Sequence, residues 1–198
     1  MHADAIDPTQ ATTPRTDTRA RILDAANELF YSQGIRATSA DRIIERVGIT
    51  KVTFYRHFRT KSDLVVAYLA QQAEREQAWM TGVAEAGEST AILAALAAGI
   101  GDASCTAGFR GCAFINAAAE FADPADPVRL AVDAHRGWMR EYFAAVATDA
   151  GADAAASVAD QLMILRDGAM VNGYLSDAAT LSAALEAGFR SVVAPRHH

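Results

Sequence analysis

The apolar positions near the start of the chain recur with the period of an α-helix. Ile22, Ala26, Leu29 and Phe30 are spaced i, i+4, i+7 and i+8, which places them on one face of a helix. Gly34 follows as a C-cap residue, because glycine adopts the left-handed conformation that ends many helices. The pattern therefore predicts an amphipathic helix that begins after a polar leader and ends at this glycine.

Two short helices and the start of a long one are predicted next, each from a hydroxyl residue that precedes apolar positions. Ser39, Thr50 and Thr60 can each accept a hydrogen bond from the first turn of a helix. Gly48 closes the helix after Ser39, and Asp63 completes a capping-box pattern with Thr60. The apolar residues expected to face inward are Ile43, Ile44, Val47, Ile49, Phe54 and Phe58.

Turn residues divide the rest of the chain into further helices, which are expected at about 90–103, 112–121, 127–150, 154–175 and 178–193. Alanine is abundant, and β-branched runs bounded by turn residues are absent, so the composition favours helices over strands. The predicted fold class is all-α with about nine helices. Three N-terminal helices form one module, which is joined to a larger helical C-terminal part.

The charge of the chain is divided unevenly between these two parts. The net charge is −6, but residues 15–70 carry +4 and residues 71–198 carry −8. Only the local field matters where a protein meets phosphates. The acidic total therefore does not exclude nucleic acid as a partner of the basic N-terminal module.

Several classes of protein and site are not expected. The longest apolar run, Ala91 to Ile100, is too short to cross a bilayer, and residues 1–18 lack the apolar segment of a signal peptide, so a cytoplasmic location without a membrane partner is expected. Cys105 and Cys112 are too few for a disulfide framework or a zinc site, and we expect them to be small buried thiols. No metal site or cofactor is predicted.

The segment Thr38 to Lys61 has the organisation of a helix-turn-helix. Two short helices meet at a turn that contains glycine, and the second helix is narrow enough to enter the major groove of DNA. An αα-hairpin with a charged, solvated side is the alternative. The residues expected to contact DNA are Ser39, Lys51, Val52, Thr53, Tyr55, Arg56, His57 and Lys61.

Reach and chemistry divide these residues into two groups. Lys51 and Thr53, in the first turn of the second helix, are expected to contact base edges, and Val52 offers an apolar contact to a thymine methyl group. The others are expected to contact phosphates, although Arg56 has the chemistry for either role.

The pattern of residues 20–69 closely resembles the DNA-binding domain of the TetR family. It reads A-x-x-L-F-x-x-x-G-x-x-x-T-S and then V-G-I-T-x-x-T-F-Y-R-H-F-x-x-K-x-D-L, without gaps. The segment Arg110 to Phe121 also looks like a segment of one branch of these regulators. The polar, proline-containing start of the chain predicts a disordered leader (1–17). The resemblance implies a DNA-binding domain (18–62) and a ligand-binding and dimerisation domain (63–198).

The resemblance also implies partners: double-stranded DNA with a palindromic operator, a small-molecule effector and a second copy of the chain. Repression is the commoner outcome in the family. The effector is expected to be hydrophobic or aromatic, and Arg166 is a candidate partner for an anionic group. Candidate residues of the effector site are Trp79, Phe109, Cys112, Phe114, Asn116, His135, Trp138, Met163, Arg166 and Met170.

An apolar stripe on the last two helices has two interpretations, the chain's own core or a dimer interface, and the resemblance favours a four-helix interface between two copies. Its residues are Leu162, Leu165, Ala169, Gly173, Leu181, Ala184, Leu185, Phe189 and Val192, with Gly188 beside them.

Two alternative functions remain from the residues themselves. Cys105 and Cys112 are candidates for a redox switch within a regulator. An all-helical enzyme would use Cys112 with His135, or Glu120 with Asp123, but neither pair belongs to a known catalytic motif.

Overall fold

The computed structural model describes residues 17–85, 87–175 and 180–194, and every regular element in them is a helix. The predicted all-α fold is therefore confirmed. The helices are α1 (Thr18–Gln33), α2 (Ala40–Val47), α3 (Lys51–His57), α4 (Lys61–Ala84), α5 (Ser89–Ser104), α6 (Ala113–Glu120), α7 (Pro127–Asp149), α8 (Ala155–Leu175) and α9 (Leu181–Val193).

The polar residues predicted to cap the N-terminal helices do so. The side chains of Ser39 and Thr50 accept hydrogen bonds from the backbone N–H groups of Arg42 and Thr53. Thr60 and Asp63 form a complete capping box at the start of α4, with both distances 3.0 Å. Local chemistry therefore decides where these helices begin.

Some expectations fall outside the described residues. The structure does not describe residues 1–16 of the predicted leader. It also does not describe residues 178–179, at the start of the last predicted helix. Asp17 is described, and its side chain caps α1 by accepting a hydrogen bond from the N–H of Arg19. Among the described residues, no helix combines the length and the apolar character needed to span a membrane.

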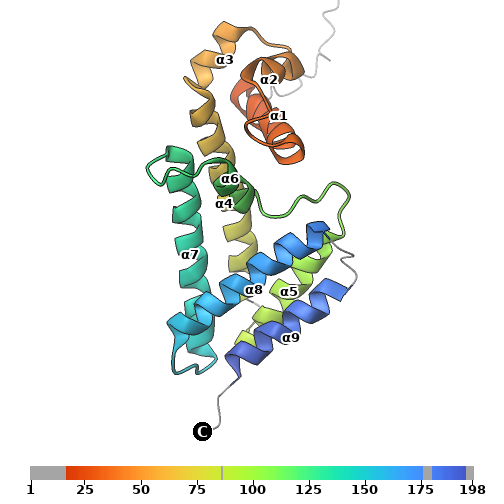
Figure 1. Cartoon of the computed structure of the whole chain (residues 1–198), viewed down its shortest axis with the longest axis vertical. Coiled ribbons are helices and arrows are strands. Elements are labelled where there is room, and N and C mark those ends of the chain that lie inside the picture. The colour runs from red at the N-terminus through yellow and green to blue at the C-terminus, as the bar shows by residue number, and fades with distance from the viewer. Residues whose placement is uncertain (1–16, 86, 176–179, 195–198) are drawn as a thin grey trace, which may run out of the picture.

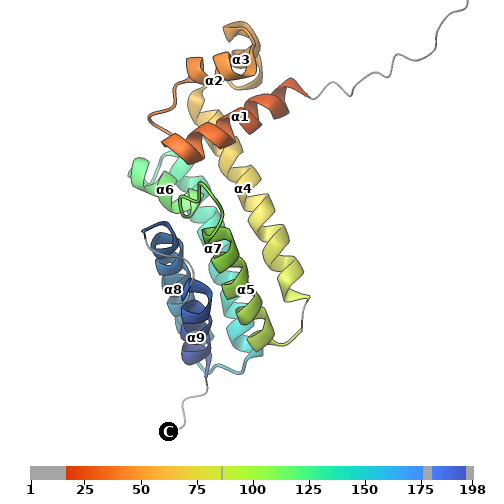
Figure 2. The same ribbon diagram turned by 90° about the vertical axis from the view of Figure 1, so that its right-hand side faces the viewer.

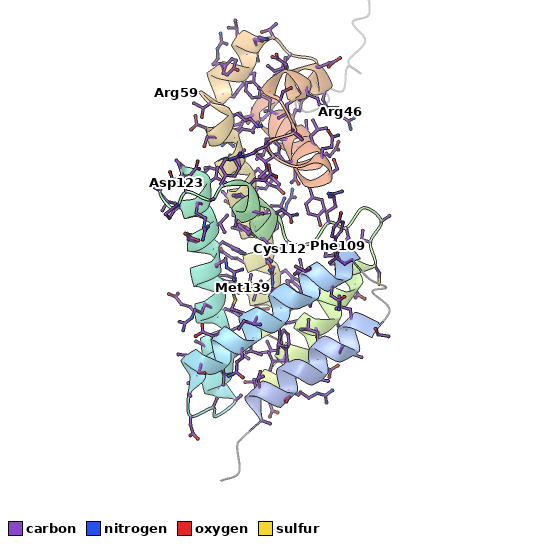
Figure 3. The ribbon with its side chains drawn as sticks, in the orientation of Figure 1. Arg46, Arg59, Phe109, Cys112, Asp123 and Met139 are labelled. Carbon is purple, nitrogen blue, oxygen red and sulfur yellow. The ribbon has the colours of Figure 1, made fainter. Side chains whose placement is uncertain are left out.

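The helices form an elongated molecule with the helix-turn-helix at one end (Figure 1). Helix α4 begins in that end and continues into the larger part of the molecule (Figure 2), where α5, α7, α8 and α9 pack on one another. The larger core includes Leu93, Met139, Phe143 and Phe189, all at most 1% exposed (Figure 3 labels Met139).

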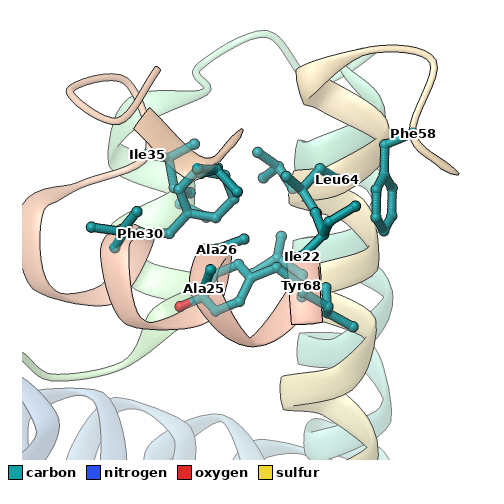
Figure 4. Close-up of a cluster of buried hydrophobic side chains, with 14 of the residues drawn as sticks. Ile22, Ala25, Ala26, Phe30, Ile35, Phe58, Leu64 and Tyr68 are labelled. Carbon is teal, nitrogen blue, oxygen red and sulfur yellow. The ribbon is translucent and has the colours of Figure 1, made fainter. Parts of the chain in front are cut away.

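The core of the N-terminal end extends beyond the first three helices. Ile22 and Phe30 of α1 pack against Leu64 and Tyr68 of α4 (Figure 4), and the rings of Phe30 and Tyr68 meet edge to face at 5.6 Å. Residues of α6 and α7, such as Phe114, join the same core. Because α4 is continuous across the expected boundary at residue 62, movement of α4 would displace the helix-turn-helix.

Candidate DNA-binding surface and effector cavity

Helix α3 presents a polar side to solvent and an apolar side to the core. Phe54 and Phe58, which lie one turn apart, are at most 3% exposed and belong to the core cluster that includes residues of α1 and α4. Val52 is 71% exposed and Tyr55 is 47% exposed, so the opposite side of the helix is open. The predicted DNA contacts therefore lie on the accessible side of α3 and next to it.

The remaining predicted contacts divide by exposure. Ser39, Lys51 and Arg56 are exposed, whereas Thr53, His57 and Lys61 are half-buried. Burial lowers the pKa of the Lys61 amine from its usual value. The elements that carry these side chains lie at one end of the molecule (Figure 1), and their contact with DNA stays a prediction.

Asp41 is a feature of this surface that the sequence pattern does not reveal. Its Oδ1 lies 2.8 Å from Nζ of Lys51, and both side chains are exposed. The hydrogen bond to Asp41 raises the pKa of the Lys51 amine. The surface that carries the predicted base contacts therefore includes the carboxylate of Asp41, which is paired with the lysine at the start of α3.

Hydrogen bonds of two side chains, Glu120 and Tyr31, join the helix-turn-helix to the larger part of the molecule. Both carboxylate oxygens of Glu120, at the end of α6, accept backbone N–H groups after α1, from Ile35 at 2.9 Å and from Arg36 at 2.6 Å. The hydroxyl of Tyr31 in α1 donates to the carbonyl of Gly111 and accepts the N–H of Arg110, both at 2.9 Å. The loop before α6 and the end of α6 are thus both attached to α1.

A cavity of about 600 Å³ lies where α1, α4, α5, α8 and the loop before α6 meet. Six of the ten predicted effector residues line it, namely Trp79, Phe109, Cys112, Phe114, Arg166 and Met170. Figure 3 shows Phe109 and Cys112 on the α1 side of α5 and α8. The cavity also includes two residues of the helix-turn-helix module, Asn27 and Tyr31 of α1.

The wall of this cavity combines apolar surface with a few polar groups. Trp79 packs against Gly99, where an added Cβ would lie 2.4 Å from the indole ring. Arg75, Glu76 and Gln72 of α4 line another part of the wall. A cavity of this size with mostly apolar walls and few polar groups is typical of small-molecule sites.

Four predicted effector residues are absent from the wall. Asn116 donates a hydrogen bond to the carbonyl of Arg110, and Met163 and Trp138 pack with the larger core. His135 stacks on the ring of Phe114 with 3.8 Å between centroids, so it lies behind the wall. Helical spacing does not distinguish a residue that faces a cavity from one that faces the core.

A buried charged network lies beside the cavity. Glu76 accepts one hydrogen bond from Arg166 at 2.6 Å and pairs with Nε2 of His135 at 3.0 Å, and Asp167 pairs with Arg166 at 3.2 Å. Burial alone would raise the pKa of Glu76, but the hydrogen bond from His135 and the charge of Arg166 hold it below its usual value.

The same network determines the state of Arg166. Burial alone would lower the pKa of its guanidinium, but Cys112, Glu76 and Asp167 together raise it. The guanidinium is therefore held as a cation and is already neutralised by two carboxylates.

The cysteines differ in accessibility, so one expectation about them is wrong. Cys112 is buried as predicted, but Cys105 is exposed at the end of α5. Cys105 ends a helix whose next residues form a turn at the surface, and the apolar spacing of the sequence does not extend to it.

The predicted dimer stripe lies mainly inside the chain. Leu162, Ala169, Leu181, Leu185 and Phe189 are at most 7% exposed and belong to the chain's own core. Leu165, Gly173 and Val192 are half-buried, and Ala184 is exposed. These five residues pack inside the chain because α8 and α9 turn this face toward α5 and α7.

The opposite face of α8 is apolar and open to solvent. Ile164 and Leu175 are each 70% exposed, and Val171 is 44% exposed. With Gly168 these residues repeat at helical spacing, and the sequence interpretation did not select them. A second cavity of about 740 Å³, between α6, α7 and α8, adjoins this face and includes Val171, Leu175 and Arg129.

Comparison with known proteins places these features in a family. A family model described as bacterial regulatory proteins of the tetR family matches residues 22–68. A crystal structure of SCO4454, a TetR-family transcriptional regulator from Streptomyces coelicolor, is 38% identical, with a TM-score of 0.85 over 89% of this chain and 94% of that one. This chain belongs to the TetR family.

Other similar proteins match a smaller share of the chain or show only the fold. The transcriptional activator FasR of Mycolicibacterium smegmatis is 36% identical over 61 residues, which span 31% of this chain but only 28% of FasR. The reduced form of NemR from Escherichia coli is 19% identical, with a TM-score of 0.78 over 90% of this chain and 98% of that one. The match to the family model extends from α1 into the first third of α4.

Membership of the TetR family excludes two of the alternatives, the αα-hairpin without a DNA-binding role and the enzyme. The helix-turn-helix is that of a family of transcriptional regulators, so a mere αα-hairpin is excluded. The relatives are regulators rather than enzymes. One member of each candidate catalytic pair also has a structural partner. Glu120 accepts backbone N–H groups after α1, and His135 pairs with Glu76.

Proposed function

We propose that this protein is a dimeric repressor in the cytoplasm that binds a palindromic operator and leaves it when a small molecule occupies the cavity beside α1. The observation that carries the proposal is the cavity itself. Its wall includes Asn27 and Tyr31 of the DNA-binding module together with residues of α4, α5 and α8. A ligand there touches the part of the molecule that must move to release DNA.

The open side of α3 supplies the DNA contacts. Lys51, Val52 and Thr53 in its first turn meet base edges, and Arg56 meets a base edge or a phosphate. The other predicted residues, Ser39, Tyr55, His57 and Lys61, donate to phosphates and fix the orientation of the helix on the duplex.

A second copy of the chain covers the exposed apolar face of α8. Ile164, Val171 and Leu175 would otherwise leave three large apolar side chains of one helix in water. A twofold axis beside α8 places two copies of α3 for two half-sites, because one short helix reads only a few base pairs.

The effector acts by shifting the population between two conformers. It binds more tightly to the conformer whose α4 holds the two α3 helices at the wrong separation for adjacent major grooves. A thousandfold loss of operator affinity needs roughly 4 kcal/mol of differential binding, which one cavity of this kind can supply.

Selection of bound fragments from a random DNA pool tests the proposal. We expect a palindrome, because two α3 helices related by a twofold axis read inverted half-sites. The double variant Lys51→Ala, Arg56→Ala should lose this selectivity, and Ile164→Asp should yield half-sites only, because it breaks the dimer. Retention of full specific affinity by the double variant contradicts the assignment of α3.

The direction of regulation has a separate test, because one relative, FasR, is named an activator. Transcription in vitro from a promoter that contains the selected palindrome should fall when the protein is added. A rise would make the protein an activator and leave the DNA-binding assignment in place.

A further inference from the structure

We infer that the cavity beside α1 binds an amphipathic organic anion, whose charged end is held by Arg75 rather than by Arg166. This inference rests on the proposed effector site. It specifies the chemistry of the ligand, an apolar or aromatic body with a single carboxylate or sulfonate group.

Arg166 is not available as the anchor that the sequence suggests. Its guanidinium is 2.6 Å from Glu76 and 3.2 Å from Asp167, and its side chain is only 4% exposed. A ligand anion at this position would meet two carboxylates in a buried place. Repulsion by these carboxylates would oppose the attraction of the arginine.

Arg75 is the opposite case. Three charged residues of the described chain line the cavity, and Arg75 is the one that forms no ion pair with another described residue. Its side chain is exposed, so the guanidinium retains its donors for a ligand at the mouth of the cavity. Planar guanidinium donors match a carboxylate or sulfonate in geometry and charge.

The neighbours of Arg75 favour an acceptor over a donor at this end. Gln72 lies one helical turn before Arg75 and lines the same wall, and its Nε2 group donates to Asn27 of α1 at 3.0 Å. Glu76 is the one carboxylate in the described wall, and both of its oxygens are occupied by Arg166 and His135. A cationic ligand would therefore find no free partner there.

The rest of the wall suits the apolar body of such a ligand. Trp79, Ile100, Phe109 and Met170 contribute ring and alkyl surface, and small residues of α5 such as Ala103 leave room between them. The ligand would lie with its anionic end toward α4 and α1 and its body toward α5 and α8.

This orientation brings the charged end to the contact between α4 and α1. Asn27 donates to Gln71 at 3.1 Å and accepts from Gln72 at 3.0 Å, which joins the two helices. An anion beside Arg75 attracts the Nε2 group of Gln72, one of whose two N–H groups donates to Asn27. Movement of this amide toward the anion would weaken one of the hydrogen bonds that hold the DNA-binding module on α4.

A matched pair of fluorescent probes tests the inference on the full-length protein. Anilinonaphthalene sulfonate and N-phenylnaphthylamine share the same aromatic body, but only the first has the anionic group. We expect Arg75→Gln to weaken binding of the sulfonate about fivefold, as for a partly exposed ion pair, and to leave binding of the neutral probe unchanged. Arg75→Lys, which keeps the charge, should retain most of the sulfonate affinity.

Arg129→Gln is the matched control, because Arg129 lines the second cavity. It should change the binding of neither probe. An unchanged sulfonate affinity in Arg75→Gln, or an equal loss for both probes, overturns the role of Arg75. In that case binding of the neutral probe with release of operator DNA would leave the effector site intact. If neither probe binds the protein, the effector site and the inference both fail.

Discussion

Asp41 places a negative charge on the surface that α3 offers to DNA. Its carboxylate is 2.8 Å from Nζ of Lys51, whereas Arg56 forms no ion pair with a described residue. When DNA binds, Lys51 must therefore leave the carboxylate of Asp41 before it can contact a base edge or a phosphate. Arg56 has no such exchange to make.

Asp41→Asn is predicted to tighten binding to non-specific DNA by about threefold, because it removes a charge that repels phosphates and frees Lys51. The salt dependence should steepen by about one unit of slope for one further phosphate contact. Fluorescence anisotropy of labelled duplex at several salt concentrations measures both quantities.

Asp102→Asn is the matched control, because Asp102 is an exposed carboxylate in α5, away from α3. It changes the net charge by the same amount and should leave the salt slope unchanged. Equal behaviour of the two variants would show that only the net charge matters.

The capping residues could be predicted from the sequence, and the pairing of Lys51 could not. Ser39 and Thr60 act within three residues of themselves, so local spacing is sufficient to find them. Asp41 and Lys51 lie on different helices, and their contact depends on the angle at which α2 and α3 meet. The paired state of Arg166 was missed for the same reason, because Glu76 lies on α4, 90 positions away.

At the scale of elements, α6 is the short helix that connects the cavity to the helix-turn-helix. Cys112, just before α6, lines the cavity, and Glu120 at its other end accepts two backbone N–H groups after α1. A displacement of α6 by a ligand would therefore act directly on the segment between α1 and α2.

Glu120→Ala is predicted to expose the backbone N–H groups of Ile35 and Arg36, because they lose their acceptor. The free energy of unfolding should fall by about 2 kcal/mol, as expected for hydrogen bonds to a charged group. Hydrogen exchange of a peptide that spans these residues should accelerate.

Glu141→Ala, which removes an exposed carboxylate from α7, should leave exchange of that peptide unchanged. Unaltered protection of the peptide in Glu120→Ala would contradict the link through α6.

Helix α8 shows the limit of a sequence pattern at this scale. It has apolar residues on two faces, and spacing alone does not tell which face is inside. Gly173 lies so close to Ser104 of α5 that an added Cβ would be 2.4 Å from its hydroxyl oxygen. This close packing fixes the rotation of α8, buries Leu162 and leaves Ile164 in solvent.

At the scale of the whole molecule, Glu76 joins three helices. It lies on α4 and pairs with His135 of α7 and Arg166 of α8. Its pKa is held below the usual value of 4.5, so the ionised form is the one that the folded state favours. This stabilisation is fully present above 4.5 and is lost as the pH falls through the lowered pKa.

Glu76→Gln is therefore predicted to lower the free energy of unfolding at neutral pH by about 3 kcal/mol, because Arg166 loses a buried partner. The difference from the wild type should shrink in acid, where Glu76 of the wild type is protonated too. Urea unfolding over a series of pH values measures it.

Glu74→Gln is the control on the same helix, because Glu74 is exposed. The free energy of unfolding of Glu74→Gln should depend on pH as that of the wild type does. If the free energies of unfolding of Glu76→Gln and the wild type differ by the same amount at every pH, the role of the ionised carboxylate is contradicted.

The close packing of Trp79 on Gly99 makes this regulator suitable for engineering as a biosensor. Because an added Cβ at position 99 would lie 2.4 Å from the indole, a methyl group there must displace Trp79, a residue of the cavity wall. Position 99 lies in α5, whereas the predicted DNA contacts lie at the cap of α2, on α3 and at the first residue of α4. One substitution at this position thus offers a way to change which compounds are detected while the promoter that responds stays the same.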